Sequence, residues 1–349
     1  MAPVLDRRLL RSSDGLQVYA EAAGNKEGPS IVFAHGLTLT AQCFDLFFED
    51  PELLKEFYLV RYDLRGHGRS AHPETLEGHA SSIWADDFMT VVNAFGLHKP
   101  VHFGWLVRTI AADYCLNVNP IPVSGIIYAC SLPWVGPLMA VVGLPAIMGF
   151  MPGLFGTDDV ALNRRVTIDF GDSVFAEPEK VPFKTRCEWI GSSVFCGPKD
   201  ANFVCSRPQD PAGLYKAGSE GLPLLILSGT LDRQVDGKIL EREMKPHFTN
   251  METKFFEGAG HAVFYDAYQG TKEAMVAFVR KVTVCGTSLR HSRARCSRRW
   301  LGMSSLWTRC FLGNNHAGHI CTDRVLHLSS GHRFSHLNCL DRILDRLPD

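Results

Sequence analysis

The chain has 349 residues, of which 46% are hydrophobic and 21% are charged, and its formal net charge at pH 7 is −1. This length is enough for one large domain or two ordinary ones, at roughly 100–200 residues each. The hydrophobic content can build a buried core, which excludes a wholly disordered chain. The near-neutral balance argues against nucleic acid or an acidic membrane surface as the main partner.

Charge is distributed unevenly along the chain. Residues 285–349 contain ten Arg and four Asp but no Lys or Glu, together with five of the eleven Cys and six of the fourteen His. Residues 1–284 therefore carry a net charge of −7, and the C-terminal segment carries +6. We predict that residues 285–349 form a poorly ordered tail.

The first residues carry charges but no apolar segment typical of a secretory signal. The odd number of Cys then indicates reduced thiols and a cytoplasmic location. The uncharged segment 132–157 is interrupted by four Pro and five Gly. Because Pro breaks helical hydrogen bonding, we expect short apolar helices and turns there, and no stable membrane span.

Short apolar runs alternate with helix-length segments in residues 1–284. In chain order, the predicted elements are strands 17–22, 31–34 and 57–62, helix 81–95, strand 101–103, helix 108–116, strands 125–129 and 222–227, helix 237–244, strand 254–256 and helix 267–282. Apolar runs bounded by Gly and polar residues suit strands buried on both faces of a parallel sheet. The alternation predicts a doubly wound, mostly parallel α/β sheet.

The alternation stops between residue 131 and about residue 221, where no clear strand is found. An insertion of this size predicts a helical cap over the end of the sheet. We therefore divide the chain into a core of residues 1–130 and 222–284, a cap of residues 131–221 and the tail.

Four polar segments directly follow predicted strands. They are His35-Gly36-Leu37-Thr38, residues 62–70 (Tyr-Asp-Leu-Arg-Gly-His-Gly-Arg-Ser), Gly229-Thr230-Leu231-Asp232 and Gly258-Ala259-Gly260-His261. Open α/β sheets bind their ligands at the carboxyl ends of the strands, which is where these segments lie.

In this order and spacing, the four segments resemble the α/β-hydrolase family over about residues 12–282. The resemblance implies an α/β-hydrolase fold with an eight-stranded type of sheet and a helical cap. It also implies that Asp232 is the acid and His261 the base of a catalytic triad, and that the oxyanion hole uses backbone N–H groups of Leu37, or a neighbour, and Val107. Such chemistry needs no metal and no organic cofactor.

The position of the nucleophile departs from the family pattern. The family carries Gly-x-Ser-x-Gly on a sharp turn after a strand, and the matching segment here is Gly104-Trp105-Leu106-Val107-Arg108. Leu106 stands where the serine belongs, and Arg108 stands where the second glycine belongs. Because leucine has no proton to lose, it cannot form an acyl intermediate, and the activity of this chain is in doubt.

Three functions remain open at this point. The first is hydrolysis of a small or medium-sized apolar ester, thioester or lactone, since an apolar cap suits a carbon-rich substrate. The second is a catalytically inactive protein that binds a small apolar ligand in the same pocket. The third is a lyase or isomerase that uses Asp232 and His261 for acid–base chemistry without a nucleophile. The sequence leaves the oligomeric state open.

The tail contains residue types that bind metals or nucleic acids. The metal-ligand types are Cys310, His316, His319 and Cys321. Their spacing lacks the paired arms of structural zinc sites, so we predict no metal there. The tail arginines do not follow one periodic face, so we predict no nucleic-acid binding.

A single cause would explain both the altered turn and the unusual tail composition. We hypothesise that a splice or frame error near codons 105–109 changed the turn, and that the tail is translated intron or shifted frame. Transcripts and genomic DNA sequenced across both junctions should then show a reading frame that differs from the one encoding the present sequence at both places. An uninterrupted match to the present sequence would refute the hypothesis.

Overall fold

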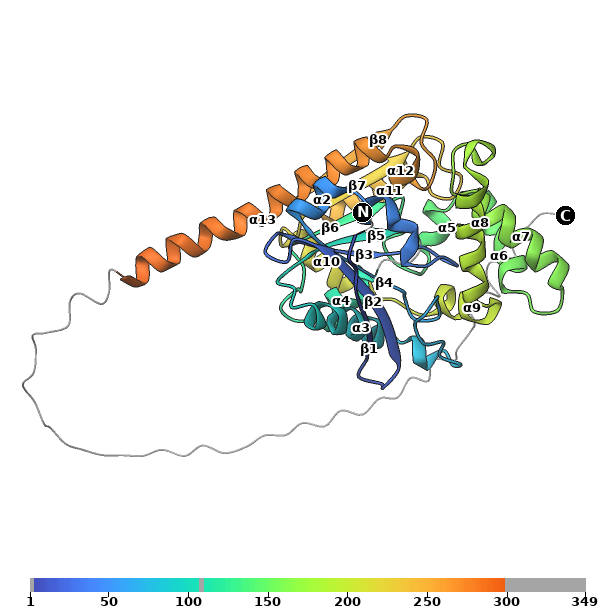
Figure 1. The fold of residues 1–349 in the computed structure, drawn as a ribbon, viewed down its shortest axis with the longest axis horizontal. Helices are drawn as coiled ribbons and strands as arrows, with labels where there is room; N and C mark the ends of the chain where they lie inside the picture. The colour runs from blue at the N-terminus through green and yellow to red at the C-terminus, as the bar shows by residue number, and fades with distance from the viewer. Residues whose placement is uncertain (1–2, 107–109, 299–349) are drawn as a thin grey trace, which may run out of the picture. The chain divides into compact units, whose positions relative to one another are not determined.

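Eight strands form one sheet in the computed structural model, which describes residues 3–106 and 110–298. The strands are β1 Asp6–Arg11, β2 Gln17–Gly24, β3 Ser30–Ala34, β4 Tyr58–Tyr62, β5 Val101–Trp105, β6 Gly125–Ala129, β7 Leu224–Gly229 and β8 Met251–Phe256. Their order across the sheet is β1-β2-β4-β3-β5-β6-β7-β8 (Figure 1). The pairs from β4 to β8 are parallel, whereas β2 is antiparallel to both of its neighbours. The predicted mostly parallel α/β sheet is therefore confirmed.

All seven predicted strands are present, but the sequence analysis missed β1. This strand reads Asp-Arg-Arg-Leu-Leu-Arg, and its residues alternate between half-buried and exposed. It lies at the edge of the sheet, where charged side chains are common because they discourage pairing with other chains. The half-buried Arg8 places its guanidinium 4.4 Å from the ring centre of Phe95 instead of burying an apolar side chain. Only Leu10 among the three half-buried residues is apolar, so the usual apolar signal of a strand is weak.

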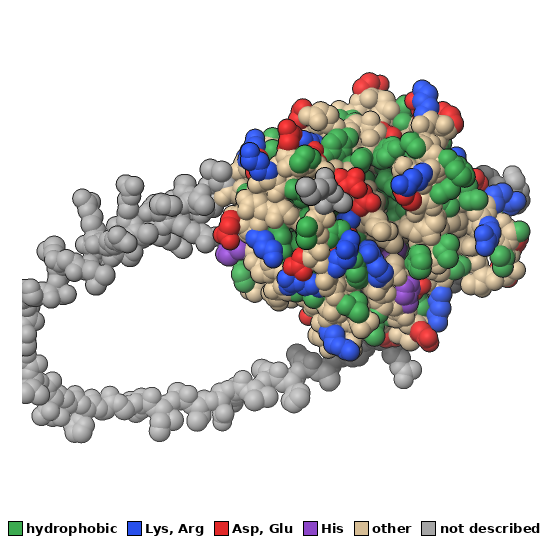
Figure 2. All heavy atoms as spheres, viewed as in Figure 1, with side chains coloured by type: hydrophobic (Ala, Val, Ile, Leu, Met, Phe, Trp, Pro, Cys, Tyr) green, Lys and Arg blue, Asp and Glu red, His purple; other side chains and the backbone are tan. Residues whose placement is uncertain are grey.

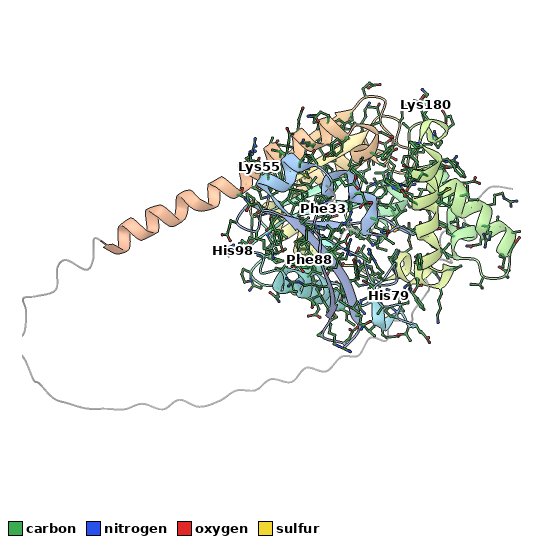
Figure 3. The ribbon with its side chains drawn as sticks, in the orientation of Figure 1. Phe33, Lys55, His79, Phe88, His98 and Lys180 are labelled. Atoms are coloured by element: carbon green, nitrogen blue, oxygen red, sulfur yellow. The ribbon has the colours of Figure 1, made fainter. Side chains whose placement is uncertain are left out.

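Aromatic side chains cover both faces of the sheet. On one face, Phe33 of β3 and Phe103 of β5 lie 5.1 Å apart between ring centres. Both rings contact those of Phe44 and Phe47, and Phe103 also contacts that of Phe264; these three residues come from segments outside the sheet. On the other face, Phe88 stacks on Tyr114 at 4.8 Å, next to His102 of β5. His102 and Phe103 thus point to opposite faces, as consecutive strand residues do, and Figure 3 labels Phe33 and Phe88.

Helices lie on both faces of the sheet and beyond its end (Figure 1). The helices are α1 Asp45–Phe48, α2 Pro51–Glu56, α3 Ser81–Ala94, α4 Ala111–Asn117, α5 Leu138–Val142, α6 Pro145–Phe155, α7 Val160–Asp172, α8 Phe183–Ser192, α9 Pro198–Ser206, α10 Ala212–Ser219, α11 Gly237–Met244, α12 Val263–Asp266 and α13 Tyr268–Arg298. Helices α5 to α9 form the insertion between β6 and β7. Helix α10 falls within the predicted range of the cap, but it packs against α4 of the core.

A buried ion pair joins the end of the cap to the core. Arg207, which follows α9, donates two hydrogen bonds of 2.8 Å to the two carboxylate oxygens of Asp113 in α4. Gln209 donates a third, of 2.7 Å, to Asp113 Oδ2. Both charged side chains are fully buried. Removing one partner of such a pair leaves an uncompensated charge, at a cost of about 3–5 kcal/mol, so this contact fixes the cap on the core.

Charged side chains of both signs are interspersed with hydrophobic ones on the face of the molecule seen in Figure 2. In the described part of the chain, no helix combines the length and hydrophobicity that crossing a bilayer would require.

The last helix is longer than predicted. The sequence indicated a helix over residues 267–282, whereas α13 runs from Tyr268 to Arg298 and so enters the segment assigned to the tail. Met275, Phe278 and Val279 are buried and dock the helix. Phe278 lies against Gly125 of β6, where an added Cβ would meet its ring at 2.9 Å. The rest of the tail lies outside the described residues.

We expect that deleting residues 285–349 changes the free energy of unfolding by less than about 2 kcal/mol, because the described side chains that dock α13 come before the cut. Denaturant titration of both chains would measure the difference. A chain that ends at residue 274 is the matched control. It lacks three buried anchors and should lose at least about 4 kcal/mol. A loss above about 2 kcal/mol in the first deletion would mean that the removed segment packs on the body.

Candidate active site

The predicted acid and base lie together at the carboxyl edge of the sheet. Asp232 follows β7, and His261 lies between β8 and α12. The Nδ1 atom of His261 is 2.9 Å from Oδ2 and 3.0 Å from Oδ1 of Asp232. The side chains are 0% and 2% exposed. A buried carboxylate at this position fixes the orientation and tautomer of the imidazole and stabilises its charged form.

Neighbouring groups hold both side chains in place. Oδ1 of Asp232 accepts hydrogen bonds from the backbone N–H of Gln234 at 2.7 Å and of Val235 at 3.1 Å. The indole of Trp105, at the end of β5, donates to the carbonyl oxygen of His261 at 3.1 Å, and the two rings lie 5.8 Å apart. The other ring nitrogen of His261, Nε2, is buried and has no hydrogen-bond partner among the described residues.

The turn after β5 keeps a strained backbone without a nucleophile. Leu106 has a φ angle of +67°, in the left-handed region that leucine rarely adopts. In the α/β-hydrolase turn, the nucleophilic residue occupies just such a sharp, strained connection between strand and helix. The side chain of Leu106 is fully buried. Gly104 and Trp105 belong to β5, whereas Val107 and Arg108 lie outside the described residues.

The loop after β3 packs directly against this turn. A Cβ atom added to Gly36 would lie 2.8 Å from Cδ2 and 3.0 Å from Cβ of Leu106, so a larger residue there would have to push the Leu106 side chain aside. His35 holds the loop: its Nδ1 lies 2.8 Å from the Gly36 carbonyl, and its Nε2 accepts from the Leu64 N–H at 2.9 Å. Leu37 is buried. No acceptor for its backbone N–H is found among the described residues, which leaves this group free to donate to a ligand.

Asp63 and Arg65, in the polar segment of residues 62–70, form hydrogen bonds and ion pairs within the fold. Asp63 accepts hydrogen bonds from the Ala41 N–H and from the Arg69 backbone and side chain, at 2.8–3.0 Å. Burial acts to raise the pKa of Asp63, but the hydrogen bonds and the positive charge of Arg69 outweigh it and lower the pKa. Arg65 forms a buried ion pair with Asp87 at 2.7 Å. Neither group is available for chemistry.

The sequence analysis missed Cys130, which lies at the site directly after β6. Sγ of Cys130, a carboxylate oxygen of Asp232 and a ring nitrogen of His261 all lie within 4.8 Å of one another. Burial, and then the charge of Asp232, raises the pKa of this thiol well above its usual value. A protonated thiol is a poor nucleophile and a poor metal ligand. Its place after a predicted strand was the one signal that could have identified it.

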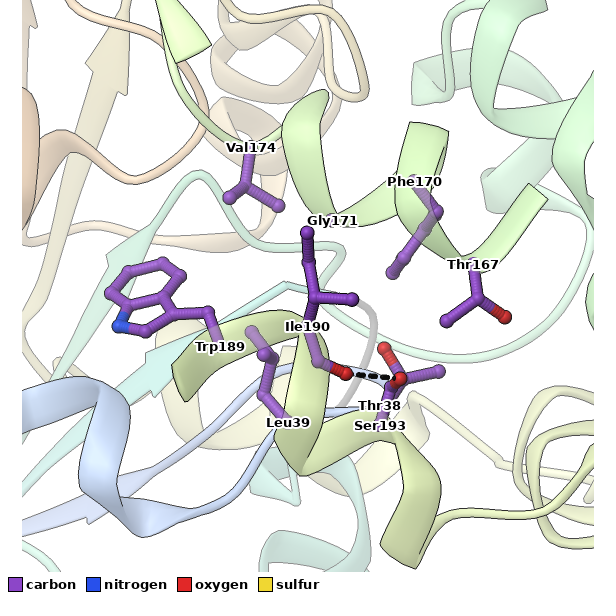
Figure 4. Close-up of a pocket in the computed structure, with 9 residues that line it drawn as sticks. All are labelled: Thr38, Leu39, Thr167, Phe170, Gly171, Val174, Trp189, Ile190 and Ser193. Carbon is purple, nitrogen blue, oxygen red and sulfur yellow. Dashed lines mark hydrogen bonds between the residues drawn. The ribbon is translucent and has the colours of Figure 1, made fainter. Parts of the chain in front are cut away.

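A small pocket lies between the loop after β3 and the cap (Figure 4). Its lining includes Thr38, Leu39, Phe170, Val174, Trp189 and Ile190. Its free volume of about 10 Å³ is room for about one water molecule. The ring of Trp189 lies 5.7 Å from that of Trp105, which in turn lies 5.8 Å from the ring of His261.

With this fold and site, the chain belongs to the α/β-hydrolase family, whose model matches residues 31–274. One relative is the "Bifunctional esterase/perhydrolase DCH" of Acinetobacter calcoaceticus, 37% identical over 97 residues. Another is the "Probable oxidoreductase EphD" of Mycobacterium tuberculosis, 36% identical over 95 residues. Each match covers 27% of this chain, and it spans 33% of the first relative and 16% of the second.

Solved esterases have a similar fold. The esterase RhEst1 from Rhodococcus sp. ECU1013 superposes with a TM-score of 0.70 and 24% identity, over 81% of this chain and 100% of that one. The esterase EaEST from Exiguobacterium antarcticum superposes with a TM-score of 0.64 and 22% identity, over 78% of this chain and 98% of that one. At these identities, the likeness concerns the fold.

We expect Gly36→Ala to destabilise the protein by about 1–3 kcal/mol, because the new methyl group overpacks the contact with Leu106. Leu106→Ala removes Cδ2, the atom nearest to the new methyl group, so part of this loss of stability should disappear in the double variant. Denaturant titration of the two single variants and the double variant would give a coupling of at least about 0.5 kcal/mol. Additive effects would contradict the described contact between the two segments.

Proposed function

We propose that the site has the architecture of a carboxylic-ester hydrolase for small or medium-sized apolar esters, thioesters or lactones, and that this chain retains the binding part of that function. The observation that carries the proposal is a fully buried Leu106 in the left-handed position of the nucleophile, beside an intact Asp232–His261 pair. The pair supports a role for His261 as base, and Leu106 offers no group that could be acylated.

No other described side chain is placed to replace the serine. The Ser131 hydroxyl donates to the Gly104 carbonyl oxygen at 2.6 Å and is committed to the end of the sheet. The thiol of Cys130 is held in its protonated form, since its pKa is raised by burial. The described part of the site therefore contains no hydroxyl nucleophile for the covalent step of a serine hydrolase.

The apolar surroundings favour a carbon-rich ligand. The pocket is walled mainly by apolar cap side chains, and Trp189 packs on Phe175 with ring centres 4.8 Å apart. The similarity to an esterase/perhydrolase supports an acyl compound as the ligand. The small free volume indicates that any ligand larger than a few atoms enters by displacing cap side chains.

A second candidate function uses His261 alone. Because its Nε2 atom is buried and unpaired among the described residues, it could exchange a proton with a bound substrate without a nucleophile. This would make the chain a lyase or an isomerase. Turnover of a non-ester substrate that depends on His261 would favour this alternative.

We predict at most trace esterase activity in the unmodified chain and no labelling by serine-directed phosphonates. Without a nucleophile, the oxyanion hole and binding still give about 10³–10⁴-fold over water. Leu106→Ser alone should restore little, because Arg108 occupies the family's glycine position, and a misplacement of about 1 Å costs about 10²-fold. The combined change Leu106→Ser, Arg108→Gly and Thr109→Gly should restore much more. Short-chain aryl esters are the substrates for this assay.

His261→Ala in each of the three backgrounds is the control, and it should abolish any restored turnover. Strong turnover by the unmodified chain that depends on His261 would overturn the proposal, since it would require a nucleophile or mechanism outside the one described. Activity that survives His261→Ala would show that the pair does not act as base.

A further inference from the structure

Three side chains of metal-binding types converge after three neighbouring strands. Cys130 follows β6, Asp232 follows β7 and His261 follows β8, and these strands are adjacent in the sheet. Sγ of Cys130, a carboxylate oxygen of Asp232 and a ring nitrogen of His261 all lie within 4.8 Å of one another. Thiolate, carboxylate and imidazole are the three side-chain ligands that Zn²⁺ takes in proteins. These three residues, the Cys–Asp–His cluster, therefore offer their donor atoms to a single point.

The spacing of the Cys–Asp–His cluster is close to that of an occupied metal site. In a tetrahedral zinc site the bonds are about 2.3 Å to sulfur and about 2.0–2.2 Å to nitrogen or oxygen, which places the ligand atoms about 3.3–3.6 Å apart. Here Nδ1 of His261 lies 2.9 Å from Oδ2 of Asp232, and no separation in the cluster exceeds 4.8 Å. Shifts of about 1 Å would therefore bring all three ligand atoms to bonding distance of one cation.

The backbone holds two of the three ligands in advance. Cys130 has a φ angle of +46°, in the left-handed region that residues other than glycine rarely adopt, and its N–H donates to the Leu227 carbonyl oxygen at 2.8 Å. Strained backbone of this kind is concentrated at functional sites. Oδ1 of Asp232 is held by the N–H groups of Gln234 and Val235, which leaves Oδ2 for a cation. Ligands that are already placed lower the entropic cost of binding.

The charges of the cluster match a divalent cation. The side chains of Cys130 and His261 are fully buried, and a buried charge has to be paired or coordinated. Asp232 supplies one negative charge, and Cys130 supplies a second when its thiol loses its proton, as a thiol does on coordination to zinc. Two anionic ligands and one neutral imidazole balance a dication. Mg²⁺ and Ca²⁺ prefer oxygen ligands and gain little from sulfur, so the cluster favours a cation that binds thiolates.

We propose that Cys130, Asp232 and His261 form a binding site for a thiophilic divalent cation such as Zn²⁺, with Sγ, one carboxylate oxygen and Nδ1 as the ligands. On binding, the thiol proton passes to solvent and the imidazole proton moves from Nδ1 to Nε2, so one proton is released per cation. A bound cation occupies both members of the acid–base pair and prevents His261 from acting as a base. The inference does not depend on the proposed function, because it requires neither an ester nor a nucleophile.

Equilibrium competition for Zn²⁺ between the full chain and a coloured chelator tests the proposal. Residues 285–349 also contain Cys and His, so the site is identified by comparing variants. We expect Cys130→Ser to weaken the binding of one equivalent of Zn²⁺ by at least about 10- to 100-fold, the range for loss of even an outer-shell partner. Cys115→Ser makes the same change at another buried thiol and is the matched control, which should keep this equivalent. Equal binding by Cys130→Ser and the unmodified chain would overturn the proposal.

A second measurement uses the unmodified chain and covers the case in which Cys130→Ser does not fold. The ¹H resonance of the His261 Nδ1–H group, which is hydrogen-bonded to Asp232, should disappear when the chain is saturated with Zn²⁺ and persist with Mg²⁺. A resonance that persists in the zinc-saturated chain would overturn the proposal. Loss of the resonance with Mg²⁺ as well would also overturn it, because the site would not select a cation that binds sulfur. Either result leaves the proposed function standing, since ester chemistry at this pair needs no metal.

Discussion

Parallel pairing of the strands from β4 to β8 is the constraint on which the rest of the structure depends. Because these strands point the same way, the segments that follow them meet at one edge of the sheet. Trp105 can therefore donate a hydrogen bond to His261, which lies 156 positions later. Asp232, the predicted acid, follows β7, which neighbours β8, and needs only a short loop to reach the imidazole. The cap closes over this edge, and its last residues are held to α4 by a buried ion pair.

The turn at Leu106 shows that this fold can keep the left-handed backbone of the turn without a nucleophilic side chain. A left-handed conformation at a residue other than glycine costs roughly 1–3 kcal/mol. Full burial of a leucine side chain contributes about 1.5–3 kcal/mol in the opposite direction, and Leu106 is fully buried against Gly36. The two terms are of similar size, so the strained turn survives without the serine that would use it. The stability of the fold therefore does not require a serine at this position.

Residues that obey a repeating pattern could be predicted from the sequence, and residues placed by tertiary contacts could not. The buried strands and the meeting of Asp232 with His261 follow from apolar runs and from the order of the strand ends. Strand β1 gives only a weak signal, because one of its half-buried side chains is Arg8, which packs on an aromatic ring. Cys130 sits in the site because β6 is adjacent to β7, which only the strand order reveals. Local patterns also gave no reason for α13 to continue beyond Val282.

Under the proposed function, leucine in place of the family's serine affects recognition as well as catalysis. In an intact triad the hydroxyl donates to the imidazole, so the free enzyme has no unsatisfied acceptor and the ester needs to supply none. With Leu106 in that place, the acceptor on His261 stays buried and unpaired among the described residues, a penalty of about 1–3 kcal/mol. A ligand with a hydrogen-bond donor that reaches Nε2 would remove this penalty, whereas an ester, which has no donor, would leave it.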